Sequence, residues 1–151
     1  MGSGIILAVL FYMIGSIPTA YLYMKFRRRR NILEEGTGNA GAMNVYEVTH
    51  SKADGIAVLF MDLLKGFIPA FLYLHVFKPD GFSFAVLAGA LVMGHNFPVW
   101  TKFKGGRGLS SAAGILLAAD PALVGIWLVV YSATRLLVNN VHFASAVALA
   151  A

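Results

Sequence analysis

Long uncharged stretches constrain this chain more than any other feature of its sequence. The first stretch runs from Gly4 to Met24, and the first charged residue is Lys25. A helix needs about 20 mostly apolar residues to cross a hydrocarbon layer about 30 Å thick. The stretch lacks a basic amino-terminal region and a small-residue cleavage site, so we do not expect a removable signal peptide. The sequence therefore predicts a membrane-spanning helix here.

Further apolar stretches follow along the chain. We expect spans at Asp54–Phe77, Phe82–Phe97 and Ala122–Val138, a short apolar segment at Gly108–Ala119 and half a span at Val141–Ala151. Of the 151 residues, 58% are apolar and 13% are charged, whereas about 25% are charged in a typical soluble domain. The sequence predicts a single all-α domain over residues 1–151, a polytopic transmembrane helix bundle with about five spans and a partial sixth.

The absence of cysteine narrows the possible chemistry. It excludes disulfide scaffolds, thiol nucleophiles and cysteine-liganded metal sites. Histidine and methionine do not occur at a spacing typical of a metal site. The net charge of +5 allows nucleic acid, anionic lipid or an anionic substrate as the partner, and the positions of the charges decide among them.

Basic residues gather in the two longest polar loops and at the end of a later span. Ten of the 12 are Lys25, Arg27, Arg28, Arg29, Arg30, Lys52, Lys102, Lys104, Arg107 and Arg135. The positive-inside rule places both loops at the cytoplasmic face and the amino terminus outside. Aromatic residues do not alternate with the run Arg27–Arg30, so we interpret the run as a topology signal beside anionic headgroups and expect no nucleic-acid partner.

The first of these loops is rich in glycine and small polar residues. We call residues 36–44 the first glycine loop, Gly36-Thr37-Gly38-Asn39-Ala40-Gly41-Ala42-Met43-Asn44. It matches a G-x-G-x-x-G dinucleotide fingerprint, but the sequence predicts neither the preceding strand nor the parallel unit that this motif requires. Small residues let a backbone wrap around an anion, and Thr37, Asn39 and Asn44 add donors. A flexible turn between helices is the alternative.

The second loop combines glycines with cations and hydroxyls. We call residues 102–111 the second glycine loop, Lys102-Phe103-Lys104-Gly105-Gly106-Arg107-Gly108-Leu109-Ser110-Ser111. Gly108 and Leu109 are expected to open a helix, and backbone amides at a helix start bind phosphate. The loop does not satisfy the Walker A pattern. The alternative is a basic membrane anchor with a flexible turn.

Polar residues inside the predicted spans are the third unusual feature. Asp62 and Lys65 are three residues apart on one helix face, so we expect a structural ion pair. His95 and Asn96, just before Pro98, lie near the cytoplasmic end of the third span. A histidine within the membrane is a functional candidate, and a hydrogen bond to another helix is the alternative.

Five motifs, in this order and between these spans, carry a resemblance to a known family. They are Gly15-Ser16-Ile17-Pro18, the first glycine loop from Thr37, Asp62-Leu63-Leu64-Lys65-Gly66, Gly94-His95 with Pro98, and the second glycine loop from Lys104. Together they resemble the bacterial PlsY family of glycerol-3-phosphate acyltransferases, whose acyl donor is acyl-phosphate. The resemblance extends from Gly15 to Ser145 and thus covers nearly the whole chain.

The resemblance implies a seven-span enzyme of the bacterial inner membrane. Such an enzyme transfers a fatty acyl group from acyl-phosphate to the 1-hydroxyl of glycerol 3-phosphate, giving lysophosphatidic acid for phospholipid synthesis, with no cofactor, neither coenzyme A nor a metal. We expect catalytic roles for His95, Asn39 and Thr37. We expect substrate contacts from Gly38, Gly41, Asn44, Lys104, Gly105, Gly106, Arg107, Ser110 and His142.

This sequence departs from the family's pattern in three places. Glu47 stands where the family has an arginine, and a carboxylate repels phosphate where an arginine would bind it. His142 stands where the family has a serine before its sixth span. The family's third motif, rich in His, Asn and Arg, has no counterpart. The apolar ending Val141–Ala151 predicts a truncated chain or completion by a partner chain, because half a helix cannot satisfy its backbone in a bilayer.

Other functional classes remain open at this point. A small anion transporter or channel subunit would place Asp62 and Lys65 along its path and Arg107 at one mouth, but the two halves of the chain show no convincing repeat. A divergent relative with another acceptor, or an inactive one, would account for Glu47. Both glycine loops are predicted on one face, and this favours a transferase acting at the membrane surface.

Overall fold

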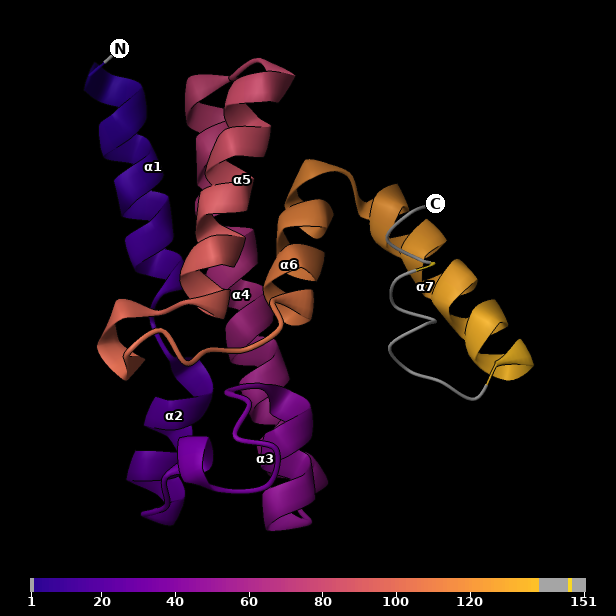
Figure 1. Cartoon of the computed structure of the whole chain (residues 1–151). Coiled ribbons are helices and arrows are strands. Elements are labelled where there is room, and N and C mark those ends of the chain that lie inside the picture. Colours follow the sequence, from indigo (N-terminus) through magenta and orange to yellow (C-terminus); the bar gives the residue numbers. More distant parts are fainter. Residues whose placement is uncertain (1, 139–146, 148–151) are drawn as a thin grey trace.

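The computed structural model describes residues 2–138 and 147 of the chain. Its elements are α1 (Gly2–Gly15), α2 (Thr19–Tyr23), the π-helical turn η1 (Met24–Arg28), the 3-10 turn η2 (Ile32–Glu34), α3 (Ala42–Thr49), α4 (Lys52–Phe77), α5 (Gly81–Asn96), the 3-10 turn η3 (Val99–Thr101), α6 (Leu109–Ala119) and α7 (Pro121–Leu137) (Figure 1). These residues include no strand, so the predicted all-α class is confirmed. His142, and all of Val141–Ala151 except Val147, lie outside the described residues.

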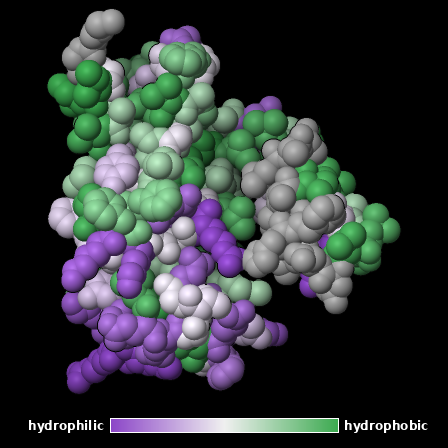
Figure 2. Space-filling view, in the orientation of Figure 1, coloured by the Kyte–Doolittle hydropathy of each residue, from purple (hydrophilic) through white to green (hydrophobic). Residues whose placement is uncertain are grey.

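Three of the described helical segments are long and apolar enough to cross a membrane, namely residues 4–28, α4, and residues 81–101, which comprise α5 and η3. The helices α6 and α7 are also apolar but shorter, with 11 and 17 residues. Figure 2 shows apolar side chains over α1 and α5, whereas hydrophilic side chains gather around α2 and α3. Phe60 and Phe82 are 57% and 80% exposed, as expected for side chains that face lipid. The architecture is that of a polytopic membrane helix bundle.

The first predicted span, Gly4–Met24, lies within the membrane-length segment 4–28, but it is not a single α-helix. The helix α1 ends at Gly15, and α2 begins only at Thr19. Pro18 lacks the N–H that would continue the helix, and its ring disfavours the helical conformation for the residue before it. The break therefore takes the Ile17 carbonyl oxygen out of a regular helix, and this oxygen lies 2.9 Å from Lys65 Nζ.

Two pairs of glycines bring the long helices into close contact. Gly15 and Gly94 lie between α1 and α5, and Gly66 and Gly114 lie between α4 and α6. A Cβ added at any of the four would overlap a backbone carbonyl oxygen of the partner helix. Small residues at membrane helix interfaces allow this approach of two backbones. The pairs thus set where α5 and α6, which flank the second glycine loop, sit against the rest of the bundle.

The polar end of the bundle contains a short helix that the hydropathy pattern does not indicate. This helix, α3, begins at Ala42 inside the first glycine loop and packs on α4. Val45 of α3 is fully buried with Ile32 and Val58 in one apolar cluster. The first glycine loop is therefore attached to the bundle at the end where it leads into α3.

Two arginines of the predicted topology signal form ion pairs at this end. Arg28 contacts Asp54 at the start of α4, with Nε 2.8 Å from Oδ2. Arg30 pairs with Glu35, directly before the first glycine loop. Surface ion pairs stabilise a fold by only about 0–1 kcal/mol each, so their main effect here is to orient the segment that leads into the loop.

Candidate active site

The first glycine loop is folded around the side chain of Asn44, which is 2% exposed. Asn44 Nδ2 donates to the carbonyl oxygens of Glu35 at 3.1 Å and Asn39 at 2.9 Å. Asn44 Oδ1 accepts from the N–H of Thr37 at 2.9 Å. The buried amide is thus used inside the protein, so Asn44 is a positioning residue for the loop, and its substrate contact stays a prediction.

The backbone amides of this loop are engaged as well. The N–H of Gly38 donates to the Glu35 carbonyl at 3.0 Å, and the N–H of Gly41 donates to the Asn39 carbonyl at 3.0 Å. These two N–H groups are therefore used inside the loop, and the substrate contacts expected of Gly38 and Gly41 stay predictions. Thr37 is exposed and Asn39 is half-buried, so these two are the polar side chains of the loop that remain accessible beside the exposed Met43.

The second glycine loop has a different construction, because it leads into a helix as predicted. Gly108, with φ +79°, precedes α6, and the first bond into the helix runs from Ala112 N–H to the Gly108 carbonyl at 2.8 Å. The amides before Ala112 are those that a helix presents at its N-terminus. Lys104 and Arg107 are exposed and Ser110 is half-buried. Cations, a hydroxyl and a helix N-terminus therefore lie together, and this combination favours anions.

The two glycine loops, far apart in the sequence, meet in the structure. The N–H of Ala40 in the first loop donates to the Gly105 carbonyl in the second at 3.1 Å. The next residue, Gly106, donates its N–H to the His95 carbonyl at the end of α5, also at 3.1 Å. One hydrogen-bonded junction thus joins both loops to the end of the third long span.

A small hollow lies beside this junction. It is lined by Ile17, Pro18, Thr19, Ala40, Lys65, His95, Pro98, Gly105 and Gly106. The break in the first span, both loops and two buried polar side chains therefore border one space. Among the predicted site residues, the hollow brings His95, Gly105 and Gly106 together with Lys65 of the expected ion pair.

A buried group of charged and polar side chains forms the floor of the site. Asp62 is 1% exposed, Lys65 is 9% exposed and His95 is 6% exposed. Lys65 Nζ lies 3.1 Å from Asp62 Oδ1 and 3.0 Å from His95 Nδ1. Burial makes unpaired charges costly, so the ammonium and the carboxylate compensate each other here. Within the described residues, no group of three or more His, Cys, Asp or Glu is placed to hold a metal ion.

Two hydroxyls in this group were not among the residues singled out from the sequence. Thr19, directly after the break in the first span, donates to Asp62 Oδ1. Ser111 Oγ lies 3.3 Å from His95 Nδ1, and Ser111 is fully buried. The Gly-Ser-Ile-Pro break and the Ser-Ser pair of the second loop were the available signals, but neither predicts which side chain points inward.

Glu47 lies apart from the buried group. It is exposed on α3, about one helical turn after Asn44. It therefore lies on the outer side of the short helix that the first glycine loop leads into, at the polar end of the bundle.

The fold and the site together define a helical integral membrane protein whose two glycine loops meet above a buried ionic group. Residues 5–151 match the glycerol-3-phosphate acyltransferase family. The chain is 40% identical to the glycerol-3-phosphate acyltransferase of Wolbachia sp. subsp. Brugia malayi over 86% of this chain and 69% of that protein. It is 38% identical to the protein of the same name from Listeria welshimeri, over 95% and 73%. The chain belongs to the glycerol-3-phosphate acyltransferase family.

Solved structures agree with this assignment. The glycerol 3-phosphate form of PlsY (YgiH), an integral membrane glycerol 3-phosphate acyltransferase, matches with a TM-score of 0.86 and 34% identity, over 97% of this chain and 72% of that chain. Its lysophosphatidic acid form matches with a TM-score of 0.83 and 33% identity. The chain is accordingly a multi-pass membrane protein. The comparisons favour the acyltransferase over the anion transporter or channel subunit.

Proposed function

We propose that this chain transfers a fatty acyl group from acyl-phosphate to the 1-hydroxyl of glycerol 3-phosphate, giving lysophosphatidic acid. The observation that carries the proposal is the junction of the two glycine loops at Ala40 and Gly105. It gathers Lys104, Arg107 and the N-terminus of α6 at the polar end of an apolar bundle. Each of the two substrates bears a phosphate, and these groups are suited to bind phosphate.

In the proposed reaction the residues of the junction bind and orient the substrates. Lys104, Arg107 and Ser110 hold phosphate oxygens, while Thr37 and Asn39 donate from the facing loop. The substrate hydroxyl oxygen forms a bond to the acyl carbon, the bond from that carbon to the phosphate oxygen breaks, and the hydroxyl proton passes to the released phosphate. Alignment of the hydroxyl and the acyl carbon supplies much of the acceleration, and fixed donors stabilise the developing negative charge.

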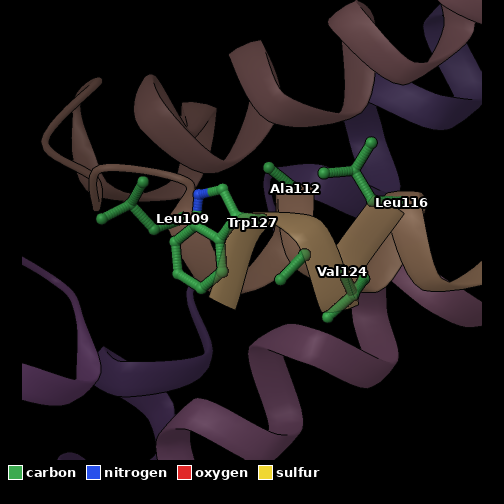
Figure 3. A pocket seen from close by; sticks show the side chains of 6 residues that line it. Leu109, Ala112, Leu116, Val124 and Trp127 are labelled. Carbon is green, nitrogen blue, oxygen red and sulfur yellow. The ribbon is translucent and has the colours of Figure 1, made fainter. Parts of the chain in front are cut away.

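A second, apolar hollow supports a place for the acyl chain. Figure 3 shows it between α6 and α7, with Leu109, Ala112, Leu116, Val124 and Trp127 around it. Leu109 directly follows Gly108 of the second glycine loop. The hollow therefore lies directly beside the loop at which we propose that the donor phosphate is held. We propose that the first carbons of the donor's acyl chain lie here.

We further propose that the chain lies in a bacterial plasma membrane, with the glycine loops cytoplasmic and the amino terminus outside. The connection between α4 and α5, which contains Lys78, lies at the opposite end of the bundle from the loops (Figure 1). Because the chain has no cysteine, Lys102→Cys and Lys78→Cys each create a single labelling site. An impermeant thiol reagent added outside intact cells should label Lys78→Cys alone. Labelling of Lys102→Cys from outside would reverse the proposed orientation.

The function is tested by acyl transfer with the purified chain in lipid nanodiscs. Palmitoyl-phosphate and glycerol 3-phosphate are supplied, and the lipid product is identified by mass spectrometry. We expect lysophosphatidic acid with palmitoyl-phosphate and none when palmitoyl-coenzyme A replaces it. Cleavage of the donor without that product would contradict glycerol 3-phosphate as the acceptor. A folded sample with no turnover would contradict the proposed activity and favour a noncatalytic relative.

A further inference from the structure

The buried ammonium of Lys65 has one acceptor for each of its three N–H groups. They are the Ile17 carbonyl oxygen at 2.9 Å, Asp62 Oδ1 at 3.1 Å and His95 Nδ1 at 3.0 Å. A protonated lysine has three donors and no lone pair to accept with. The Asp62 carboxylate compensates its charge in this buried setting. Lys65 therefore donates to all three neighbours, including the histidine nitrogen.

This donation determines which nitrogen of His95 carries the proton. A neutral imidazole has one N–H and one lone pair, and the partner of one nitrogen decides the state of the other. Because Nδ1 accepts from Lys65, the proton must be on Nε2. Ser111 Oγ, 3.3 Å from the same Nδ1, can add a second donor to this nitrogen. Asp62 Oδ1 lies 3.5 Å from the same Nδ1 and is the one neighbour that would accept a proton from it. The ammonium of Lys65 is closer, at 3.0 Å, and cannot accept a hydrogen bond, so it favours the lone pair on Nδ1.

The edge of the ring that carries Nε2 faces the second glycine loop. A Cβ added at Gly106 would overlap His95 Nε2, so only a glycine leaves room for the ring at this position. The same histidine lines the hollow at the junction of the loops. The proton on Nε2 therefore lies at the edge of the ring that borders the proposed substrate site.

We propose that Lys65 fixes His95 as its Nε2–H tautomer, so that His95 serves as a hydrogen-bond donor to a substrate oxygen and not as a general base. Lys65 and Ser111 are then positioning residues, and Asp62 balances the charge of Lys65. The donor role of His95 toward a substrate rests on the proposed acyl transfer. The tautomer itself is a property of the resting protein, so it is tested independently of turnover.

The tautomer is measured by nitrogen-15 NMR of the full chain, labelled at histidine, in nanodiscs. The His95 signals are assigned by their loss in His95→Gln. We expect a protonated Nε2 and an unprotonated Nδ1 in the unaltered chain, and a loss of this preference in Lys65→Met. A protonated Nδ1 in the unaltered chain would overturn the proposal. An unchanged tautomer in a folded Lys65→Met sample would overturn the role given to Lys65.

Two substitutions of His95 distinguish a role as hydrogen-bond donor from a role as general base. Glutamine places its amide nitrogen near the position of Nε2, whereas asparagine places it near Nδ1. We expect His95→Gln to keep kcat within about tenfold, and His95→Asn to lose about 10²–10³-fold, the effect of removing one donor to developing charge. His75→Gln is the matched control, because His75 is exposed and its Nδ1 lies 2.9 Å from the carbonyl oxygen of Phe71, one turn earlier in its own helix. Equal losses in both His95 variants, with unchanged melting temperatures, would support a base and refute the donor.

Discussion

Among single residues, Glu47 is the one whose charge we expect to oppose binding of an acceptor phosphate, because it stands where the family has an arginine. It is exposed on α3, the helix that continues from the first glycine loop, while Asn44 one turn earlier is buried and holds that loop together. A substitution at position 47 therefore changes the charge near the loop without removing a contact that shapes it. The buried polar residues behave differently, because an amide or hydroxyl left unpaired in the interior costs about 1–3 kcal/mol.

Replacing Glu47 by arginine should improve the use of glycerol 3-phosphate. The change replaces a repulsion by an attraction, and each exposed charge is worth on the order of 1 kcal/mol at short range. We expect kcat/KM for glycerol 3-phosphate to rise about tenfold in Glu47→Arg. The value for Glu47→Gln should lie between those of the unaltered chain and Glu47→Arg. The rates are measured in nanodiscs at constant ionic strength. Lower activity in both variants would instead give the carboxylate a role of its own in acceptor binding.

At the scale of helices, backbone contact through glycine decides how the site is held. His95 is the residue after Gly94 on α5, and Ser111 of α6 places its carbonyl oxygen against Gly66 of α4. The two glycine interfaces therefore set the positions of residues that form the buried floor of the site. A substitution at either glycine interface should therefore shift the whole helix, and with it the site residues that the helix carries. It would not remove a side-chain contact of the site itself.

Alanine at Gly94 tests this dependence, with Gly89 of the same helix as its control. A Cβ at Gly94 would overlap the Tyr12 carbonyl oxygen, whereas nothing lies within 4 Å of a Cβ at Gly89. Forcing extra volume into a packed contact costs about 1–3 kcal/mol. We expect a lower melting temperature and reduced transfer in Gly94→Ala, and neither effect in Gly89→Ala. Equal stability of the two variants would show that the close helix contact is not required.

The sequence predicts most of the helices, but it predicts less of the site. Apolar runs bounded by Asp80 and Asp120, both of which cap a helix through a side-chain hydrogen bond, indicate α5 and α7. Pro18 alone predicts a break in the first span, but the uninterrupted apolar run around it predicts one continuous helix. The inward side chains of Thr19 and Ser111 depend on neighbours far away in the sequence, which no local pattern encodes.

At the scale of the whole molecule, the junction of the two glycine loops is the feature on which the proposed function depends. The loops lie about 65 residues apart in the sequence, and only the packing of the spans brings Ala40 to Gly105. The chain spans 69% and 73% of the length of the Wolbachia and Listeria relatives. It nevertheless contains both loops, the buried ionic group and the hollow between them.

The proposed function requires that this junction bind the phosphate of glycerol 3-phosphate, and a measurement of equilibrium binding tests this requirement. The dissociation constant is measured by calorimetry in nanodiscs for the unaltered chain, Arg107→Ala and Lys78→Asn. Both variants lose one exposed cation, but the connection that contains Lys78 lies at the opposite end of the bundle. Hydrogen bonds to charged groups contribute about 1.5–3 kcal/mol, so Arg107→Ala should weaken binding about tenfold or more, and Lys78→Asn should leave it unchanged. Equal affinity in all three proteins would contradict phosphate binding at the junction.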